Sequence, residues 1–207
     1  MNKAHSVQSF NEPFPYVVVD DFFSEKELVN IYNELDWYVS NYQHYFDSPR
    51  RTGTAVDLRS AQKKSNAGFF IDGVYTHPKY SSIARCSESF FNSSIANIKD
   101  NYIIGKNALP ANGILLSYYN NGDFYKPHSD QSYLTACLWL YKEPKRYEGG
   151  NFIFSDCNLP IECKNNRMVI FPGSVVHEVT EIKMNKDDYY NGYGRFTVSY
   201  FLAPPRN

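Results

Sequence analysis

The first apolar segment of the chain leads into an amphipathic pattern. Residues Tyr16 to Val19 form a short run rich in β-branched side chains, which is typical of a strand. The segment Ser24-Glu25-Lys26-Glu27 has the S-x-x-E form of a helix capping box. Apolar side chains follow it at positions 28, 31, 32 and 35, the spacing of one helix face. The pattern therefore predicts a strand that leads into an amphipathic helix.

The stretch from residue 41 to residue 66 is polar and basic, and it carries Arg50, Arg51, Lys63 and Lys64. We interpret it as a long loop, because it offers few apolar positions for packing. The loop is either a solvated surface feature or a lid whose basic side chains contact a substrate. Beyond it, apolar residues recur at steps near 3.6 at positions 83, 90, 91, 95, 98 and 102, which predicts a second helix or a broken pair of helices.

From residue 112 the pattern changes to short apolar segments separated by Gly, Pro, Asn and Asp. We expect seven strands, at residues 113–119, 133–141, 151–154, 160–163, 167–171, 175–182 and 195–202. Many short strands in succession favour a sandwich or barrel, and the helices supply the apolar cover that one face needs. The prediction is one mainly β domain over residues 1–207, with helical support from 1–111 and a jelly-roll barrel from 112–207.

Composition narrows the protein class. The chain has 207 residues, of which 17% are aromatic, enough to fill a core, and its net charge of -1 gives no overall attraction to a polyanion or an acidic membrane. No apolar run approaches the roughly 20 residues of a spanning helix, and the N-terminus has no signal-peptide pattern. We expect a soluble cytoplasmic protein. The four cysteines (Cys86, Cys137, Cys157 and Cys163) form no paired C-x-x-C motif and are expected to be free thiols.

Three residues form a candidate metal site. His128 and Asp130 are two positions apart, so in a strand both side chains point to one face, and His177 follows a Phe-Pro-Gly-Ser turn that aims the next strand. Two histidines and one carboxylate are the facial ligand set of non-haem Fe(II) oxygenases. A zinc hydrolase is the alternative, but it needs a nearby general base that the neighbouring residues do not clearly offer. Structural, hydrogen-bonded histidines are the other alternative.

A series of motifs resembles prolyl 4-hydroxylase-type 2-oxoglutarate- and Fe(II)-dependent dioxygenases. The segments that carry the resemblance are residues 13–24, 119–130, 135–140, 149–152 and 171–179. The resemblance implies a double-stranded β-helix fold in which His128, Asp130 and His177 bind Fe(II). It also implies 2-oxoglutarate and O₂ as co-substrates, suggests ascorbate as a further cofactor, and implies hydroxylation of an unactivated C–H bond.

The resemblance also indicates where 2-oxoglutarate binds. Tyr119 matches a co-substrate-binding tyrosine, whereas Trp139 stands where many relatives have another tyrosine and offers one indole N–H instead. Family spacing alone favours Lys186 as the anchor of the distal carboxylate. We choose Arg195 because its guanidinium binds a carboxylate through two hydrogen bonds. In addition, Thr197 and Ser199 share its strand face, whereas Lys186 lies in a polar, Gly-containing stretch.

The substrate is less well defined than the chemistry. Peptidyl proline is preferred because of the resemblance and because the 18 tyrosines can line a groove for an extended peptide. A free amino acid or another small metabolite is the rival, since the chain has no room for a separate peptide-binding domain. A nucleic-acid demethylase is less favoured, because outside residues 41–66 no basic stripe is interleaved with aromatics. A non-catalytic ligand-binding barrel is the alternative from another class, and its mark is a damaged triad.

Overall fold

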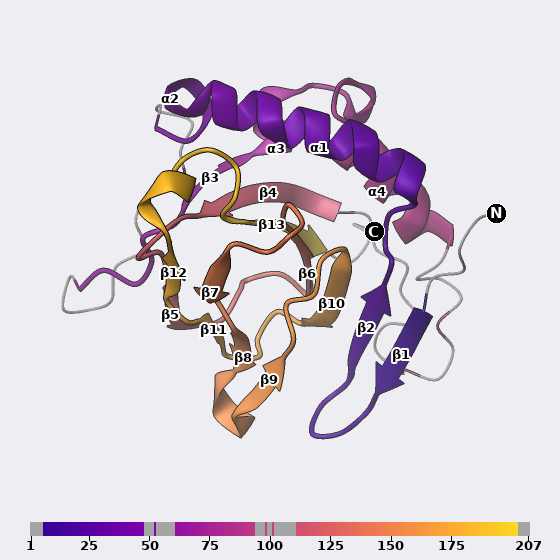
Figure 1. Cartoon of the computed structure of the whole chain (residues 1–207). Helices are drawn as coiled ribbons and strands as arrows, with labels where there is room; N and C mark the ends of the chain where they lie inside the picture. The colour runs from indigo at the N-terminus through magenta and orange to yellow at the C-terminus, as the bar shows by residue number, and fades with distance from the viewer. Residues whose placement is uncertain are drawn as a thin grey trace.

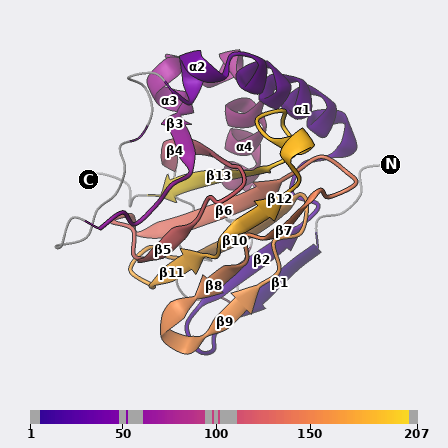
Figure 2. The same ribbon diagram turned by 60° about the vertical axis from the view of Figure 1, so that its left-hand side comes forward.

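The structure, a computed structural model, describes residues 6–47, 52, 61–93, 98, 101 and 111–202. Two antiparallel sheets face each other, and helices cover the outer face of the larger one. Figure 1 shows α1 (Glu25–Ser40) lying across the larger sheet, with the smaller sheet on the opposite side. The view in Figure 2 shows the same three layers.

The larger sheet has seven strands in the order β1-β2-β10-β6-β13-β4-β3. In chain order the strands are β1 (Ser6–Phe10), β2 (Tyr16–Asp20), β3 (Ala67–Phe70), β4 (Ala111–Tyr119), β6 (Leu134–Leu140), β10 (Arg167–Pro172) and β13 (Arg195–Leu202). The last of them, β13, lies between β4 and β6 and pairs antiparallel with both. Strands from both ends of the chain therefore build one sheet.

The smaller sheet has the order β5-β11-β8-β9, and a two-stranded sheet, β12-β7, lies beside it. Their strands are β5 (Tyr125–His128), β7 (Tyr147–Gly149), β8 (Phe152–Phe154), β9 (Leu159–Ile161), β11 (His177–Val179) and β12 (Ile182–Met184). Two single-turn helices, η3 (Ser155–Cys157) and η4 (Lys186–Asp188), lie in the connections. These short strands carry the two histidines of the candidate site.

Helix α1 begins at a complete capping box. The Ser24 side chain accepts from the Glu27 amide, and the Glu27 carboxylate accepts from the Ser24 amide, so two otherwise unpaired donors are satisfied. The other helical segments are α2 (Tyr42–Tyr45), α3 (Ile71–Val74), η1 (Pro78–Tyr80) and α4 (Ser82–Ser93). Among the described helices none is both long and apolar enough to cross a membrane.

The larger sheet separates two hydrophobic clusters because side chains alternate along each strand. On β13, Phe196, Val198 and Tyr200 pack with the helices, whereas Arg195 and Thr197 lie on the face toward the smaller sheet. The outer cluster includes Ile31 of α1. The inner cluster is rich in aromatic residues: Tyr16, Tyr119, Trp139, Tyr141, Tyr147, Phe152, Phe154 and Phe171. Strand β13 thus contributes both to the apolar core beneath the helices and to the interior between the two sheets.

The predicted fold class is confirmed as mainly β with helical support, but several elements differ. Strands β1, β2 and β3 come from the first half of the chain, so this half adds to the sheet as well as covering it. The segment predicted as one strand at 175–182 instead contains β11 and the first residue of β12. The chain changes partners between them: the Thr180 amide donates to the Asn151 carbonyl, whereas Ile182 pairs with Gly149 of β7. Residues 41–66 are not a plain loop: α2 forms there, and Tyr45 and Phe46 are buried. Arg50 and Arg51 lie outside the described residues.

Candidate functional site

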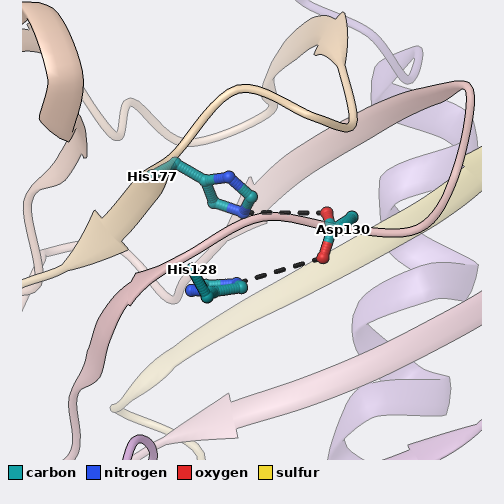
Figure 3. A group of neighbouring side chains, drawn as sticks. All are labelled: His128, Asp130 and His177. Carbon is teal, nitrogen blue, oxygen red and sulfur yellow. Dashed lines mark ion pairs between the residues drawn. The ribbon is translucent and has the colours of Figure 1, made fainter. Parts of the chain in front are cut away.

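His128, Asp130 and His177 converge on one point between the sheets (Figure 3). His128 ends β5 and His177 begins β11, and the two are directly paired across these strands. Asp130 Oδ1 lies 4.0 Å from His128 Nε2, and Asp130 Oδ2 lies 3.7 Å from His177 Nε2. Two ligands bound to one ion at about 2.1 Å lie at most about 4.2 Å apart, so both distances fit a shared metal.

Strand alternation does not bring Asp130 to the histidines, contrary to the sequence interpretation. Strand β5 ends at His128, and Asp130 lies in the irregular segment that follows. Its amide donates to the carbonyl of Gly173, 2.8 Å away, and its Oδ2 accepts from the Thr135 hydroxyl at 2.7 Å. The carboxylate is therefore held by β6 and by the segment before His177, which a local pattern does not reveal.

Both histidine rings are oriented by backbone hydrogen bonds. His128 Nδ1 lies 2.9 Å from the carbonyl of Lys126, and His177 Nδ1 lies 2.9 Å from the carbonyl of Val175. A carbonyl oxygen only accepts, so each Nδ1 carries the proton and each Nε2 offers a lone pair toward Asp130. This arrangement is typical of histidines that bind a metal through Nε2.

Burial keeps both imidazoles neutral at physiological pH. Burial and the neighbouring His177 lower the pKa of His128 to about 3. Burial also lowers the pKa of His177, although Asp130 acts in the opposite direction. Aromatic packing restrains the rings: Tyr125 stacks on His128 with ring centroids 3.5 Å apart, and Phe152 stacks on His177 at 5.4 Å. Neutral, fixed imidazoles suit a divalent metal.

A cavity of about 80 Å³ adjoins the triad. Seven of the eight predicted metal and co-substrate residues line it: His128, Asp130, His177, Tyr119, Trp139, Thr197 and Ser199. The cavity therefore connects the candidate metal ligands with most of the predicted 2-oxoglutarate contacts.

Arg195 is fully buried and is not among the residues that line this cavity, but it contacts Tyr119, which is. Its guanidinium stacks on the Tyr119 ring, 4.5 Å from the ring centroid, and Nη1 donates to the Gly150 carbonyl and to Cys163 Sγ. Its Nε and Nη2 have no hydrogen-bond partner among the described residues. Lys186, the other candidate anchor, is exposed in η4.

These donors fit a bound carboxylate. Trp139 Nε1 and Thr197 Oγ1 are also buried without a partner in the described part of the chain. A buried donor without a partner is unfavourable, and buried charges in proteins are normally paired. Because the group consists of one cation and neutral donors, an anion with several acceptor atoms satisfies it. The distal carboxylate of 2-oxoglutarate is such a group.

Sequence reasoning did not assign three further residues of the cavity, Asn66, Tyr125 and Phe152. Lys64, one of the basic residues expected to contact a substrate, lines the cavity with them. Asn66 is 3% exposed, and its Oδ1 has no hydrogen-bond partner among the described residues. Its position is fixed because the adjoining Ser65 exchanges hydrogen bonds with Phe124. Asn66 immediately precedes β3, and no local motif marks it, since its place depends on pairing with a distant strand.

The thiol prediction holds for all four cysteines, which are free. Cys163 contacts Arg195, and Cys137 lines the cavity, with its Sγ 3.7 Å from Ser199 Oγ. Burial raises the pKa of Cys137 to about 12, so this side chain stays a neutral thiol at physiological pH.

One family model matches the second half of the chain, where the triad lies. Residues 114–203 match the family model of the 2OG-Fe(II) oxygenase superfamily. The resemblance inferred from the motifs is therefore confirmed for the part of the chain that carries the triad. No curated protein sequence matches the chain.

Solved structures give the same fold, a double-stranded β-helix core. A Pseudomonas putida prolyl-4-hydroxylase is similar with a TM-score of 0.60 and 14% identity, over 92% of this chain and 93% of that one. A viral collagen prolyl hydroxylase from Paramecium bursaria Chlorella virus-1 has a TM-score of 0.51 and 14% identity, over 92% and 96%. An oxidoreductase of the 2OG-Fe(II) oxygenase family from Burkholderia pseudomallei has a TM-score of 0.53 and 13% identity, over 91% and 84%.

Proposed function

We propose that this protein is an Fe(II)- and 2-oxoglutarate-dependent dioxygenase that hydroxylates an unactivated C–H bond, with a peptidyl proline as its substrate. The observation that carries the chemistry is the convergence of two neutral imidazoles and one carboxylate beside a cavity. Three protein ligands on one side of the metal leave positions for other ligands. When bound, iron and 2-oxoglutarate supply the oxidising chemistry through oxygen activation coupled to decarboxylation of the co-substrate.

In this proposal the side chains of the protein bind, orient and shield. His128, Asp130 and His177 hold the metal. The two histidines donate to the carbonyls of Lys126 and Val175, and Asp130 accepts from the Thr135 hydroxyl, which keeps the three ligands in place. Arg195, assisted by Thr197, Trp139 and Tyr119, binds the distal carboxylate. Ser199 borders the cavity beside Cys137.

Aromatic and aliphatic side chains keep water away from the reacting centre. Phe152 and Phe171 pack on the His177 ring, with centroids 5.4 Å and 4.9 Å away, and Val179 lines the cavity. Exclusion of water strengthens each electrostatic contact in the site and protects reactive species from side reactions. An intact triad in such a setting argues against the non-catalytic barrel.

The preference for a peptide rests on the motif resemblance and on two similar structures that are prolyl hydroxylases, although at 14% identity they carry the fold rather than the substrate. A free amino acid is the second candidate.

The experiment supplies Fe(II), 2-oxoglutarate and oxygen with two substrate sets, proline-containing peptides and free amino acids. We expect succinate formation and a mass gain of one oxygen atom in the peptide set. The His177→Ala variant is the control, and both signals should vanish in it. Oxygen addition only to a free amino acid contradicts the peptide assignment but keeps the chemistry. Succinate formation equal in wild type and His177→Ala contradicts the dioxygenase itself.

A further inference from the structure

Asn66, which lines the cavity beside the triad, carries a buried acceptor. The residue is 3% exposed, and its Oδ1 has no hydrogen-bond partner among the described residues. Buried side-chain oxygens normally accept a hydrogen bond, and a buried one without a partner is unfavourable. An acceptor of this kind indicates a donor that comes from outside the chain.

Backbone pairing on both sides fixes the position of Asn66. The Ser65 amide donates to the carbonyl of Phe124, the residue before β5 of the smaller sheet. Ala67 begins β3 and pairs with Tyr118 of β4 in the larger sheet. Asn66 thus stands where the chain passes from one sheet to the other, on the side of the molecule where Figures 1 and 2 both show β3 and β5. A side chain held between two sheets is preorganised to bind a ligand.

The segment that holds Asn66 also contacts a residue that packs on a metal ligand. Lys64 pairs with Tyr125, and the Tyr125 ring stacks on His128 with centroids 3.5 Å apart. Asn66, His128 and Asp130 line the same cavity, whose volume is about 80 Å³. In so small a cavity, a group that is hydrogen-bonded to Asn66 lies near the candidate metal position.

The buried polar atoms without partners in the cavity lining are of two kinds. Trp139 Nε1 only donates and Thr197 Oγ1 is able to donate, so both suit a carboxylate. Asn66 Oδ1 only accepts. The carboxylates and the keto group of 2-oxoglutarate also only accept, and dioxygen has no hydrogen to donate. Neither co-substrate complements Asn66, which leaves the substrate as the source of the donor.

We propose that Asn66 Oδ1 accepts a hydrogen bond from a main-chain amide N–H of the substrate and thereby orients the target residue beside the metal. This inference rests on the proposed function, because it takes a proline-containing peptide as the substrate. The nitrogen of a peptidyl proline carries no hydrogen, so the donor is the amide of a residue next to the proline. Asn66 then determines specificity: it selects a substrate that offers an N–H at this point.

The test compares a proline peptide with two depsipeptides, in which the amide N–H of the residue before or after the proline is replaced by an ester oxygen. Wild type and Asn66→Ala are assayed with each. Loss of one hydrogen bond lowers kcat/KM by about 3- to 10-fold. We expect this loss for wild type with one of the depsipeptides and for Asn66→Ala with the amide peptide. Changing both partners should cost no more than changing one.

A conservative variant and a matched control separate this role from a structural one. Asn66→Asp keeps an acceptor oxygen and should keep the preference for the amide peptide over the ester. Asn120 is also 3% exposed and its Nδ2 has no partner among the described residues, but it does not line the cavity. Asn120→Ala should therefore keep the wild-type preference for the amide peptide.

Binding of the co-substrate provides an independent readout. The Mn²⁺-loaded protein is titrated calorimetrically with 2-oxoglutarate, without oxygen and without peptide. Wild type and Asn66→Ala should bind it equally well, because an acceptor does not contact an anion. A loss of 2-oxoglutarate affinity in Asn66→Ala contradicts the assignment of Asn66 to the substrate.

The outcomes distinguish the inference from its premise. If the ester substitutions lower kcat/KM equally in wild type and Asn66→Ala, the Asn66 assignment is wrong and the proposed function stands. The same holds if neither substitution affects wild type. If wild type adds oxygen to no proline peptide, the substrate assignment and this inference both fall.

Discussion

The two faces of the larger sheet differ in whether their buried polar groups have hydrogen-bond partners within the protein. On the face toward the helices, the buried hydroxyls are paired: Tyr200 with Ser87, and Tyr38 with Glu34. Glu34 in turn accepts from Ser81 and from the amides that begin α4. On the face toward the smaller sheet, donors of Arg195 and Thr197 have no partner among the described residues. Both faces are built from the same strands.

Burial of polar groups therefore has different consequences on the two faces. A buried polar group with a partner stabilises the fold, whereas one without a partner destabilises it until a ligand arrives. The face toward the helices is therefore expected to determine stability and the inner face to determine binding. Substitutions on the two faces should change different measurements.

The largest effect on stability should come from the face toward the helices. Phe69 of β3 is fully buried, and its ring lies 5.0 Å from Tyr38, 5.1 Å from Tyr45 and 5.4 Å from Phe46. Phe69→Ala should lower the free energy of unfolding by about 3 to 5 kcal/mol. Urea denaturation measures this loss. The affinity of the folded protein for 2-oxoglutarate should stay within about threefold of wild type. A larger change would show that the face toward the helices also determines binding.

The next effect is on binding and comes from the inner face. Arg195→Ala should weaken 2-oxoglutarate binding by about 2 to 5 kcal/mol, because a buried charge-assisted pair is lost. Lys186→Ala is the matched control: Lys186 is exposed, and its removal should leave the affinity unchanged. Titration of the Mn²⁺-loaded variants, with circular dichroism to verify folding, measures both. Loss of affinity in the lysine variant alone would make Lys186 the anchor.

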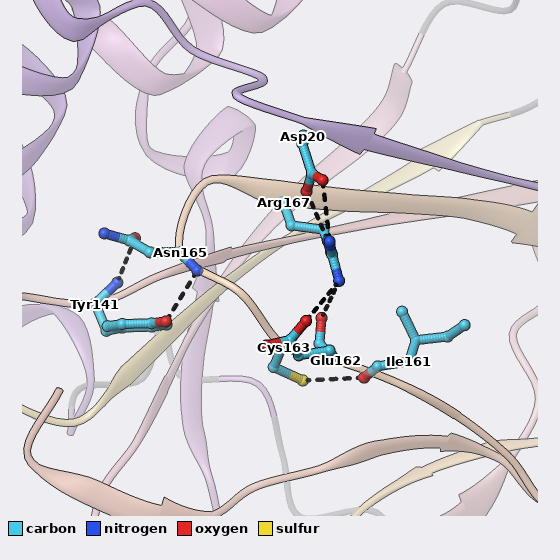
Figure 4. Close-up of polar contacts among 7 residues, drawn as sticks. All are labelled: Asp20, Tyr141, Ile161, Glu162, Cys163, Asn165 and Arg167. Atoms are coloured by element: carbon cyan, nitrogen blue, oxygen red, sulfur yellow. Dashed lines mark hydrogen bonds and ion pairs between the residues drawn. The ribbon is translucent and has the colours of Figure 1, made fainter. Parts of the chain in front are cut away.

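The smallest expected effect concerns a polar pair on the inner face whose members are hydrogen-bonded to each other, unlike the donors of Arg195 and Thr197. Arg167 Nε and Nη2 donate to both oxygens of Asp20, at 2.6 Å and 3.0 Å, and join β2 to β10 (Figure 4). Both side chains are 15% exposed. We expect Asp20→Asn to lower the free energy of unfolding by about 1 to 2 kcal/mol without changing 2-oxoglutarate affinity. A change in affinity contradicts the separation of paired from unpaired groups.

The stabilisation by Asp20 should also depend on pH in a defined direction. The hydrogen bonds from Arg167 lower the pKa of Asp20 in the folded state, against the effect of burial. A lowered carboxyl pKa stabilises the protein above the unfolded pKa of about 3.9, and this stabilisation is lost as pH falls through the folded value. The difference between wild type and Asp20→Asn should therefore be constant near neutral pH and shrink below about pH 4.

The sequence predicted that His128, Asp130 and His177 come together and where the first helix starts, because both predictions depend on local motifs. The capping box at Ser24 lies within four residues, and His128 and His177 stand in segments that resemble a known family. The predicted fold class followed from the same family resemblance. Asp130 lies beside the two histidines as expected, but hydrogen bonds with Gly173 and the Thr135 hydroxyl hold it there, not strand alternation.

The missed features depend on contacts between distant segments. Strand β1 is largely polar and exposed, so no hydrophobic pattern marks it, and its pairing with β2 defines it. Asn66 enters the cavity only because β3 pairs with β4. The buried Tyr147 hydroxyl has no hydrogen-bond partner among the described residues, and only the three-dimensional arrangement reveals this. The aromatic residues of α2 were a local indication of packing, but the polar composition of residues 41–66 as a whole favoured a loop.

The central position of β13 bears on how the protein is made. Strands β4 and β6 each pair with β13, so they cannot be joined in the native order until residues 195–202 have left the ribosome. Until then the nascent chain presents two strand edges with unpaired amides and carbonyls, which are prone to wrong pairing. The same residues bring Arg195. Completion of the sheet and arrival of Arg195, the proposed co-substrate anchor, are thus one event in synthesis, and a nascent chain that lacks residues 195–202 has neither.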